Sequence, residues 1–449
     1  MQMKNNKLKL NPAQIMVLGF ASVIFFGAIL LNLPIASKNG ESIGFINALF
    51  TATSAVCVTG LVVVDTGTYW SVFGKTVILI LIQVGGLGFM TMATLFFFLF
   101  GKRITLRERL VMAEAFNQFN ISGVVRLAQY VLIVTFTIEG IGAFLLSLKF
   151  IPIYGKTKGI AYGIFHAVSA FCNAGFDLIG DYNSMTPFVD DVLVNVVIWV
   201  LIVVGGLGFA VITDIIQKRR FNRFSLHSKL VLYISGILIL VGFISIFILE
   251  YNNPETMGRL SLKGKFLAGM FHAITPRTAG FNTLAMDKMA TASIFLTIVL
   301  MFIGGSSGST AGGVKTTTAG VLLWTIISII KGKEDTEVFQ KRIPRDIVNR
   351  SLAVVGIAMT LVIFVTMILS ITEPEFEFME IFFEATSAFG TVGLSLGITP
   401  KLSAISKVVI SITMFAGRVG PLTFALALAR QQQKRKGLIK YPEEKVIVG

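Results

Sequence analysis

The chain has 449 residues, of which 54% are hydrophobic and 14% charged, and its formal net charge at pH 7 is +15. Soluble globular proteins carry about a quarter charged residues, so this composition excludes a chain of ordinary soluble domains. The excess of apolar side chains instead predicts a protein embedded in a membrane.

Apolar spans come in four pairs along the chain. The first spans lie at residues 15–33, 127–150, 230–249 and 351–371, and the second spans at 74–100, 192–216, 293–330 and 405–428. The segment between them has a core of about ten to twelve residues, too short to cross a bilayer, which takes about twenty residues in a helix. The pattern predicts a unit made of a spanning helix, a short re-entrant helix with its loop, and a second spanning helix.

Two motifs recur in these units. The short segments start with Phe-x-Ala and are followed by a glycine; the pairs are Phe50 and Gly60, Phe165 and Gly175, Phe271 and Gly280, and Phe383 and Gly393. The third copy is one residue shorter between these two positions. A second motif, Val84–Phe89, recurs unchanged as Val204–Phe209 and more weakly as Ile303–Gly308 and Ala416–Pro421.

Matched spacing of two motifs in four copies predicts four repeats. The repeats would occupy residues 1–102, 103–220, 221–335 and 336–449, the last with a C-terminal tail. Because two spans return the chain to its starting side, all repeats share one orientation, unlike the inverted repeats of many transporters. We therefore expect an all-α integral membrane protein with eight transmembrane helices and four re-entrant pore loops, in pseudo-fourfold symmetry around a central pore.

Basic residues gather in five stretches, at 4–9, 102–109, 218–229, 331–350 and 430–440. They flank the spans at every second crossing, and acidic residues occupy the intervening loops. This distribution predicts topology, with both termini cytoplasmic, and it argues against nucleic-acid binding; a role in binding anionic lipid stays open. The apolar run at 15–31 could be a signal peptide, but no convincing small-residue cleavage site follows, so we interpret it as the first membrane helix.

The loops after the short helices have the chemistry of an ion filter. Irregular backbone at membrane depth must be buried in protein or line water, and four loops could satisfy this by turning carbonyl oxygens onto a dehydrated cation. Glycine enters such conformations at little steric cost. The side chains are neutral, which favours a monovalent cation over Ca2+. The expected lining residues are Val58, Thr59, Gly60, Asn173, Ala174, Gly175, Thr278, Ala279, Gly280, Thr391, Val392 and Gly393.

The second span of the third unit contains a run of small and polar residues that should break a helix. The run comprises Gly304, Gly305, Ser306, Ser307, Gly308, Ser309, Thr310, Ala311, Gly312 and Gly313, with Lys315 close behind. Close packing of helices through small residues would also use such a run. We favour a mobile loop under the filter that obstructs the pore.

Arg418 lies at the mid-depth of the last span, where the first two units carry Gly86 and Gly206. A charge at this depth is costly, so we predict that Arg418 faces the pore below the filter as an electrostatic barrier or gate contact. An ordinary interhelical ion pair is the alternative. Lys315 could act in the same way, or it could pair with Asp214 or Glu384.

Other isolated ionisable residues have more modest predicted roles. His166 and His272 occupy equivalent repeat positions, and we expect capping or packing rather than metal binding, because two ligands make no closed site. Glu139 needs a partner in its apolar span, with Arg126 or a neighbouring subunit as candidates. Arg277 adjoins the third loop and could tether it from behind.

Three other functions are disfavoured by the sequence: an enzyme, a coupled carrier and a structural scaffold. The only cysteines, Cys57 and Cys172, imply no disulfide framework. We find no phosphate-cradling loop, nucleophile elbow or zinc-spaced His/Cys pair, so an enzyme is not expected. A proton- or Na+-coupled carrier for a larger solute, with Glu139 or Asp214 as a relay, would predict inverted repeats. A structural scaffold would not need four matched glycines.

Together, the four units, the single-glycine loops and the interrupted helix resemble the Trk/Ktr/HKT superfamily of K+ transporters over essentially the whole chain. Since no helices precede the first unit, the chain is similar to the KtrB type of membrane subunit rather than to the longer TrkH type. Only Thr391–Gly393 keeps three letters of the Thr-Val-Gly-Tyr-Gly filter of tetrameric K+ channels.

The resemblance implies channel-like K+ uptake in the cell membrane, with K+ at the filter carbonyls, an intramembrane gate loop and Na+ as a candidate activator. It also implies a homodimer seated on a cytosolic ring of nucleotide-binding, RCK-type subunits of the KtrA/KtrC kind, with nucleotide bound only by that partner and no covalent cofactor. We expect three basic segments to contact this ring: the loops 218–229 and 331–350 and the tail after Arg430. The apolar end at Val446–Gly449 is expected at the dimer interface.

Overall fold

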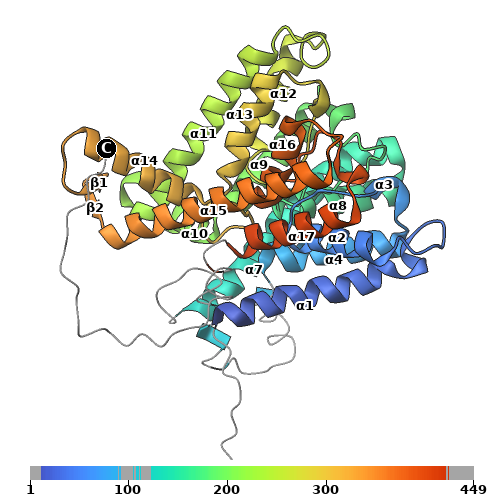
Figure 1. Cartoon of the computed structure of the whole chain (residues 1–449), viewed down its shortest axis with the longest axis horizontal. Coiled ribbons are helices and arrows are strands. Elements are labelled where there is room, and N and C mark those ends of the chain that lie inside the picture. The colour runs from blue at the N-terminus through green and yellow to red at the C-terminus, as the bar shows by residue number, and fades with distance from the viewer. Residues whose placement is uncertain are drawn as a thin grey trace, which may run out of the picture.

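The structure is a computed structural model of the whole chain, and it describes residues 12–88 and 123–420 together with positions 91, 92, 105, 108–110, 112 and 423. The basic stretches 4–9 and 430–440, most of 102–109, and the predicted interface segment 446–449 lie outside the described residues. The described part is almost entirely helical (Figure 1). One two-stranded ribbon, β1 (Thr336–Val338) paired antiparallel with β2 (Lys341–Ile343), corrects the all-α prediction locally.

Within this described part, four helices are long and apolar enough to cross a membrane. They are α1 (Pro12–Asn32), α7 (Val124–Tyr154), α11 (Leu226–Glu250) and α15 (Arg345–Thr372). Large apolar side chains on their outer faces are exposed, among them Phe26 at 62% and Ile248 at 69%. A helix that is apolar on its outer face needs lipid there rather than water, so the chain is a multi-pass membrane protein.

Each long helix is followed by a short helix that is mostly buried. The short helices are α2 (Phe45–Val56), α8 (Lys156–Phe171), α12 (Leu262–Ile274) and α16 (Phe378–Gly390). Two of their starts are set by local capping: Ser261 accepts from the Gly264 N–H, and Glu377 and Glu380 form a capping box. The phenylalanine of the first motif is buried in all four, which anchors each short helix inside the protein.

The helices that come next stop earlier than hydropathy predicts. They are α4 (Val72–Leu87), α9 (Val192–Leu207), α13 (Thr291–Phe302) and α17 (Ala404–Val419). The predicted continuous span 192–216 is wrong, because α10 (Phe209–Lys218) leaves α9 at 99°. In the third group a loop separates α13 from α14 (Thr316–Ile330), as the run of small residues in the span 293–330 predicts. The spans predicted at 74–100 and 405–428 also break, at Gly88 and Gly420, and the residues after these two glycines lie mostly outside the described part of the chain.

Short helical turns complete the described chain. They are η1 (Pro34–Ala36), α3 (Thr66–Tyr69), η2 (Thr186–Phe188), η3 (Phe221–Arg223), η4 (Met286–Lys288) and η5 (Thr399–Lys401).

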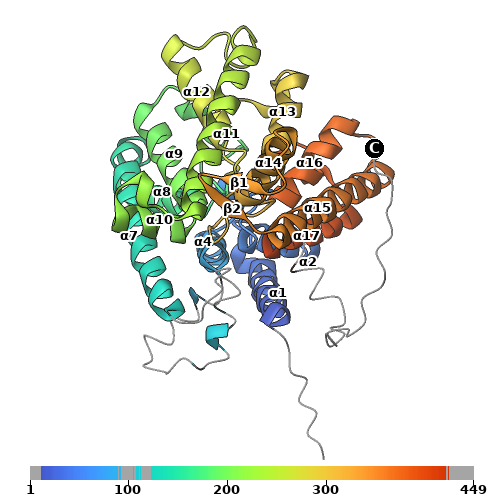
Figure 2. The same ribbon diagram turned by 90° about the vertical axis from the view of Figure 1, so that its left-hand side faces the viewer.

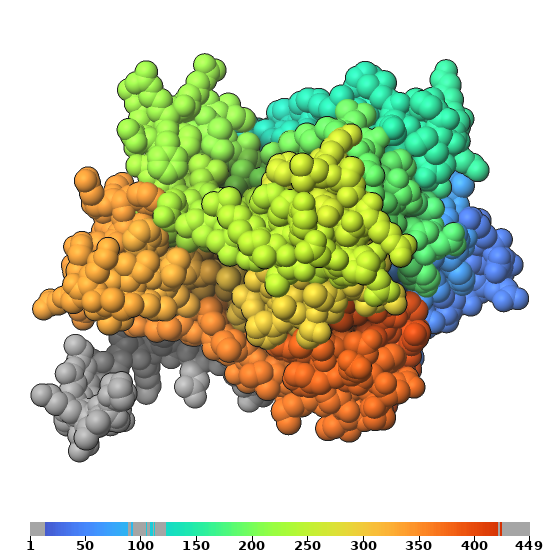
Figure 3. All heavy atoms as spheres, turned by 90° about the horizontal axis from the view of Figure 1, so that it is seen from above, coloured from blue at the N-terminus to red at the C-terminus, as the bar shows by residue number. Residues whose placement is uncertain are grey.

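Helix contacts close a ring of four groups. Each long helix packs on the short helix that follows it, and one kind of pair recurs between neighbouring groups: α4 on α8, α9 on α12, α13 on α16, and α17 on α2. Viewed from the side, the blue, green, yellow and red groups surround a common centre (Figure 2). The space-filling view from above shows the green, yellow and orange groups meeting on one face (Figure 3). The last group therefore returns to the first.

The hairpin of α7 and α8 gives a test of how closely these helices must pack. A Cβ on Gly159 would lie 2.6 Å from the Ile151 backbone, whereas nothing lies within 4 Å of one on Gly140 in α7. We expect Gly159→Ala to destabilise the purified protein by about 1–3 kcal/mol, the usual cost of overpacking.

Gly140→Ala is the matched control and should be neutral or slightly stabilising, because alanine is the better helix former. Melting in detergent, followed by the loss of the monodisperse peak in size-exclusion chromatography, measures both. Equal melting temperatures for the two variants would contradict the close packing of α7 and α8.

Candidate functional site

The four loops that follow the short helices share one backbone course. The first residue of each predicted triplet has a positive φ, at 50° for Val58, 58° for Asn173, 70° for Thr278 and 52° for Thr391. The glycine two positions later is also positive, at 94°, 69°, 80° and 91° along the chain. A positive φ is unfavourable for β-branched residues such as valine and threonine. Strain of this kind, repeated at equivalent positions, is typical of functional sites.

The shorter third loop keeps this geometry by shortening the end of its helix. In the other three groups the middle residue of the triplet donates its N–H to the carbonyl five residues back, as Thr59 does to Ser54 at 2.8 Å. In the third group, Ala279 donates to Thr275, four residues back, at 2.9 Å. The missing residue is therefore absorbed before the triplet, and Thr278–Gly280 keeps the register of the other three triplets.

The four glycines meet one another in a closed ring. A Cβ on Gly60 would lie 2.6 Å from the Ala174 carbonyl oxygen, one on Gly175 would lie 2.8 Å from that of Ala279, and one on Gly280 would lie 2.5 Å from that of Val392. The ring closes where Gly393 approaches the Thr59 carbonyl oxygen even more closely. The structure thus brings the four predicted triplets together, with no space at the glycines for a side chain.

Side chains of the short helices hold the loops from behind. Ser54 and Ser387, at equivalent positions, accept from the N–H groups of Gly60 and Gly393, both at 3.1 Å. In the second and fourth groups, the residue after the motif phenylalanine binds the segment that follows the triplet glycine. His166 Nε2 accepts from the Leu178 N–H at 3.1 Å, and Glu384 accepts from the Ser395 hydroxyl at 2.8 Å. His272 instead contacts Thr297 at 3.2 Å. These contacts match the structural role predicted for the histidines.

The glycines of the second motif explain how the helices approach the loops. The first glycine of the motif packs against the carbonyl at the end of a short helix, as Gly85 does at Val56, Gly205 at Phe171 and Gly417 at Phe389. The glycine three positions later ends or breaks the helix. Its φ is 81° at Gly88, 93° at Gly208 and 96° at Gly420, whereas the third copy has Ser307 at this position. Hydropathy missed this break, but the glycine in three of the four copies of the motif is a signal that could have found it.

The loop at residues 303–315 lies against the second and fourth groups. Ser306 donates its N–H to Gly206 O at 3.0 Å, and the Thr310 hydroxyl lies 3.0 Å from Gly205 O and 3.2 Å from Phe171 O. A Cβ on Gly312 would clash with Thr391, the first residue of the fourth triplet. The run of small residues therefore breaks the helix, as predicted, and it places a loop next to the ends of the short helices.

Arg418 connects this loop to the first group. Its guanidinium donates to the carbonyl oxygens of Thr310 and Gly85, and to that of Gly86 at 3.0 Å. No ion pair among the described residues includes Arg418, so the alternative of an interhelical ion pair is wrong. A cation held by three carbonyl groups keeps its hydrogen bonds but is not neutralised.

Three predicted partners need correction. Lys315 bonds to the Ala311 carbonyl at 2.7 Å, not to Asp214 or Glu384; these two carboxylates accept from Ser228 and Ser395 instead. Glu139 does not pair with Arg126.

Glu139 instead accepts from the Gln83 amide at 3.1 Å and lies 3.7 Å from the sulfur of Cys172, the residue before the second triplet. Cys172 and Cys57 are both free thiols. Arg277 does bind behind the third loop, with 2.9 and 3.1 Å bonds to Ser235 on α11.

Known proteins resemble this chain over nearly its full length. The sequence model of the family described as "TrkH: Cation transport protein" matches residues 10–436. The Ktr system potassium uptake protein B of Bacillus subtilis is 45% identical, with 98% of each chain covered. The potassium/sodium uptake protein NtpJ of Enterococcus hirae is 44% identical, with 99% of each covered. The crystal structure of the potassium transporter TrkH from Vibrio parahaemolyticus is 18% identical, has a TM-score of 0.74, and covers 96% of this chain and 87% of that chain.

The pair of Glu139 and Gln83 allows a test of the support behind the second triplet. Glu139 is 5% exposed, and replacing it by leucine leaves the half-buried Gln83 amide without this acceptor. We expect Glu139→Leu to cost about 1 kcal/mol of stability, the net contribution of a typical hydrogen bond.

Glu139→Gln is the control, because its side-chain oxygen can still accept from Gln83. It should melt close to the unaltered protein in the same detergent. If Glu139→Leu melts at the temperature of Glu139→Gln, the hydrogen bond contributes nothing and this interpretation of Glu139 fails.

Proposed function

Since the chain belongs to the TrkH family of cation transport proteins, we propose that it is the K+-translocating membrane subunit of a Ktr-type uptake system. Four repeats in one chain, with the boundaries expected from the sequence, surround a single ion pathway. The observation that carries this proposal is the closed ring of four glycines, each loop having the same two positive φ values. The names of the relatives in Bacillus subtilis and Enterococcus hirae support K+ as the substrate.

The ring would select by its backbone oxygens. The triplets have neutral side chains, and the middle residue of each loop brings its carbonyl oxygen next to a glycine of the neighbouring loop. Carbonyl oxygens can replace the hydration shell of K+. A membrane potential that is negative inside favours entry by about 2.3 kcal/mol per charge for each 100 mV. Movement through the ring would therefore be passive uptake.

The loop 303–315 and Arg418 would form the gate. The loop lies against the short-helix ends of the second and fourth groups, and Arg418 fixes it to the first group through carbonyl bonds. A guanidinium at this position would also repel a cation leaving the ring. Regulation would come from a cytosolic ring of nucleotide-binding, RCK-type subunits. Two copies of this chain would form a homodimer seated on that ring. Na+ would activate uptake. Relatives named as Ktr system proteins support a multi-subunit system.

A coupled carrier is the second candidate, and the contacts of its proposed relay residues do not favour it. Glu139 is bonded to Gln83, and Asp214 is bonded to Ser225, Ser228 and Lys218. Neither carboxylate is left free to exchange a proton with a bound solute. The channel-like mechanism therefore remains the better supported proposal.

The first test is tracer Rb+ uptake into K+-loaded liposomes that contain the purified protein, with K+, Na+ or choline as competitor. A serine at Gly280 would enter an unfavourable φ of 80° and clash with the Val392 carbonyl. We expect saturable uptake that K+ blocks and Na+ hardly affects, and we expect Gly280→Ser to lose this preference by about tenfold or more. Discrimination on that scale is about 1.4 kcal/mol, within what one displaced carbonyl can change.

Gly397→Ser is the matched control. Gly397 has a φ of 95°, but nothing lies within 4 Å of a Cβ there. It imposes the same backbone strain in the segment after the fourth loop, away from the ring, and it should keep selectivity. Uptake that is indifferent to K+, Na+ and Gly280 would remove the filter proposal, and absent uptake would be repeated with the regulatory ring added.

Arg418→Gln tests the gate in the same liposomes. Glutamine removes the charge and cannot reach all three carbonyl groups that the guanidinium contacts. We expect Rb+ uptake to rise about tenfold or more, because roughly 1.5–3 kcal/mol of charge-assisted bonding to the loop is lost.

Arg418→Lys keeps the charge and one carbonyl bond, so its uptake should lie between those of Arg418→Gln and the unaltered protein. If uptake by Arg418→Gln equals that of the unaltered protein while selectivity persists, Arg418 is not a gate contact.

A further inference from the structure

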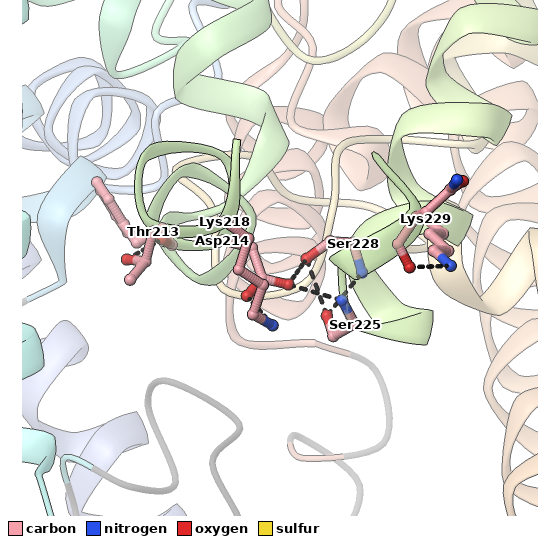
Figure 4. A network of polar contacts seen from close by, with 8 residues as sticks. Thr213, Asp214, Lys218, Ser225, Ser228 and Lys229 are labelled. Atoms are coloured by element: carbon pink, nitrogen blue, oxygen red, sulfur yellow. Dashed lines mark hydrogen bonds and ion pairs between the residues drawn. The ribbon is translucent and has the colours of Figure 1, made fainter. Parts of the chain in front are cut away.

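Asp214 connects α10 to the beginning of α11. Its carboxylate accepts from the Ser225 N–H at 2.9 Å and from the Ser228 hydroxyl at 2.7 Å, and it pairs with Lys218 at 2.7 Å (Figure 4). Ser225 is the N-cap of α11. A carboxylate at a helix N-terminus satisfies free N–H groups and is favoured by the helix dipole. Asp214 therefore fixes one helix to the start of the next.

The opposite end of α10 is bonded to the loop 303–315. The Phe209 N–H donates to the Gly308 carbonyl at 3.0 Å, and a Cβ on Gly208 would lie 2.7 Å from the Ser307 carbonyl oxygen. Helix α10 has ten residues, a length of about 15 Å. One short rigid element thus joins this loop to the base of α11.

Gly208 is where α10 can pivot. The helix axis changes direction by 99° there, and the φ of Gly208 is 93°. A glycine in this conformation offers little resistance to further rotation. Beyond this pivot, the buried side chains of Val211 and Ile212 pack α10 against the protein, and Asp214, in the middle of α10, bonds it to the start of α11.

The junction held by Asp214 also touches the β1–β2 ribbon. The ring of Phe221, in η3 between α10 and α11, lies 6.2 Å from that of Phe339 at the tip of the ribbon, and Phe339 lies 5.9 Å from Tyr233 on α11. Phe339 and its neighbours Lys341 and Arg342 are exposed. A displacement of the ribbon therefore has a path of direct contacts to the base of α10.

We propose that Asp214 is a positioning residue for the loop 303–315 and acts on it through α10. With Asp214 in place, the position of the α11 start determines where Phe209 holds the Gly308 carbonyl. Without it, α10 pivots about Gly208 and the loop loses a fixed attachment. The description of this loop as a gate rests on the proposed function, whereas the coupling itself does not.

The test is hydrogen exchange of the purified full-length protein in detergent, read by mass spectrometry on peptides that cover residues 209–218 and 303–315. Asp214→Asn keeps the shape of the side chain and removes its charge. We expect about tenfold faster exchange in both segments, since hydrogen bonds to charged groups stabilise local structure by this order. Ser228→Ala removes one of the contacts and should give a smaller change in the same segments. If Asp214→Asn does not fold, Ser228→Ala carries the test.

The matched control is Asp346→Asn, which neutralises an exposed aspartate in the first turn of α15. It should leave both segments unchanged. Faster exchange that stops at residues 214–228 and leaves 303–315 unaltered would overturn the coupling. An unaltered exchange pattern in Asp214→Asn would overturn the attachment itself.

A transport readout separates positioning from general damage. In liposomes, Asp214→Asn should change the maximal rate of Rb+ uptake severalfold while the half-saturating Rb+ concentration stays constant, because the glycine ring is not touched. Asp214→Glu, which keeps the charge, should restore part of the rate. A changed half-saturating concentration would contradict a positioning role. Suppose that Asp214→Asn alters hydrogen exchange at 303–315 but the unaltered protein shows no K+ selectivity. That result would support the coupling and overturn the proposed function.

Discussion

A peptide group at membrane depth must find its hydrogen-bond partner inside the protein, because lipid offers none. This constraint governs every place where the chain leaves a helix. The amides of Gly304, Ser306 and Thr316 in or next to the interrupted segment bond to Val314, Gly206 and Gly305. In the described part of the chain, the interrupted segment lies where its own residues and the second group supply these acceptors.

Glycine allows the helix groups to come close enough for these backbone hydrogen bonds. At Gly85, Gly205 and Gly417 a helix touches the carbonyl end of a short helix with no side chain between them. The third group departs from this pattern, because Gly304 faces the Gly312 carbonyl of its own loop. Helix α13 ends at Phe302, before the equivalent contact could form. One group is therefore free to place a loop where the other three place a helix.

The motifs located the four triplets that meet in the glycine ring, because a positive φ and a close approach both require glycine and so leave a trace in the sequence. The direction of a helix leaves no trace in its hydropathy, which is why the span at 192–216 was expected to be continuous. The partners of Glu139, Lys315 and Arg418 were also missed. Lys315 and Arg418 bind backbone carbonyls, which every residue has, and Arg418 and Gly85 are 333 positions apart. Sequence patterns can locate an unusual side chain, but here they could not identify its acceptor.

The choice of carbonyl ligands for Arg418 has an energetic consequence. A buried ion pair is expensive to separate, because removing one partner leaves the other charge uncompensated. Neutral carbonyl groups leave no buried anion behind when the bonds of Arg418 to Thr310 and Gly86 break, so only the guanidinium then needs new acceptors. Carbonyl oxygens are also the ligands that a K+ ion would use in the glycine ring. If the pathway is the one proposed, the arginine and the permeating ion need the same kind of ligand, and a loop held by carbonyls alone can be released without stranding a buried anion.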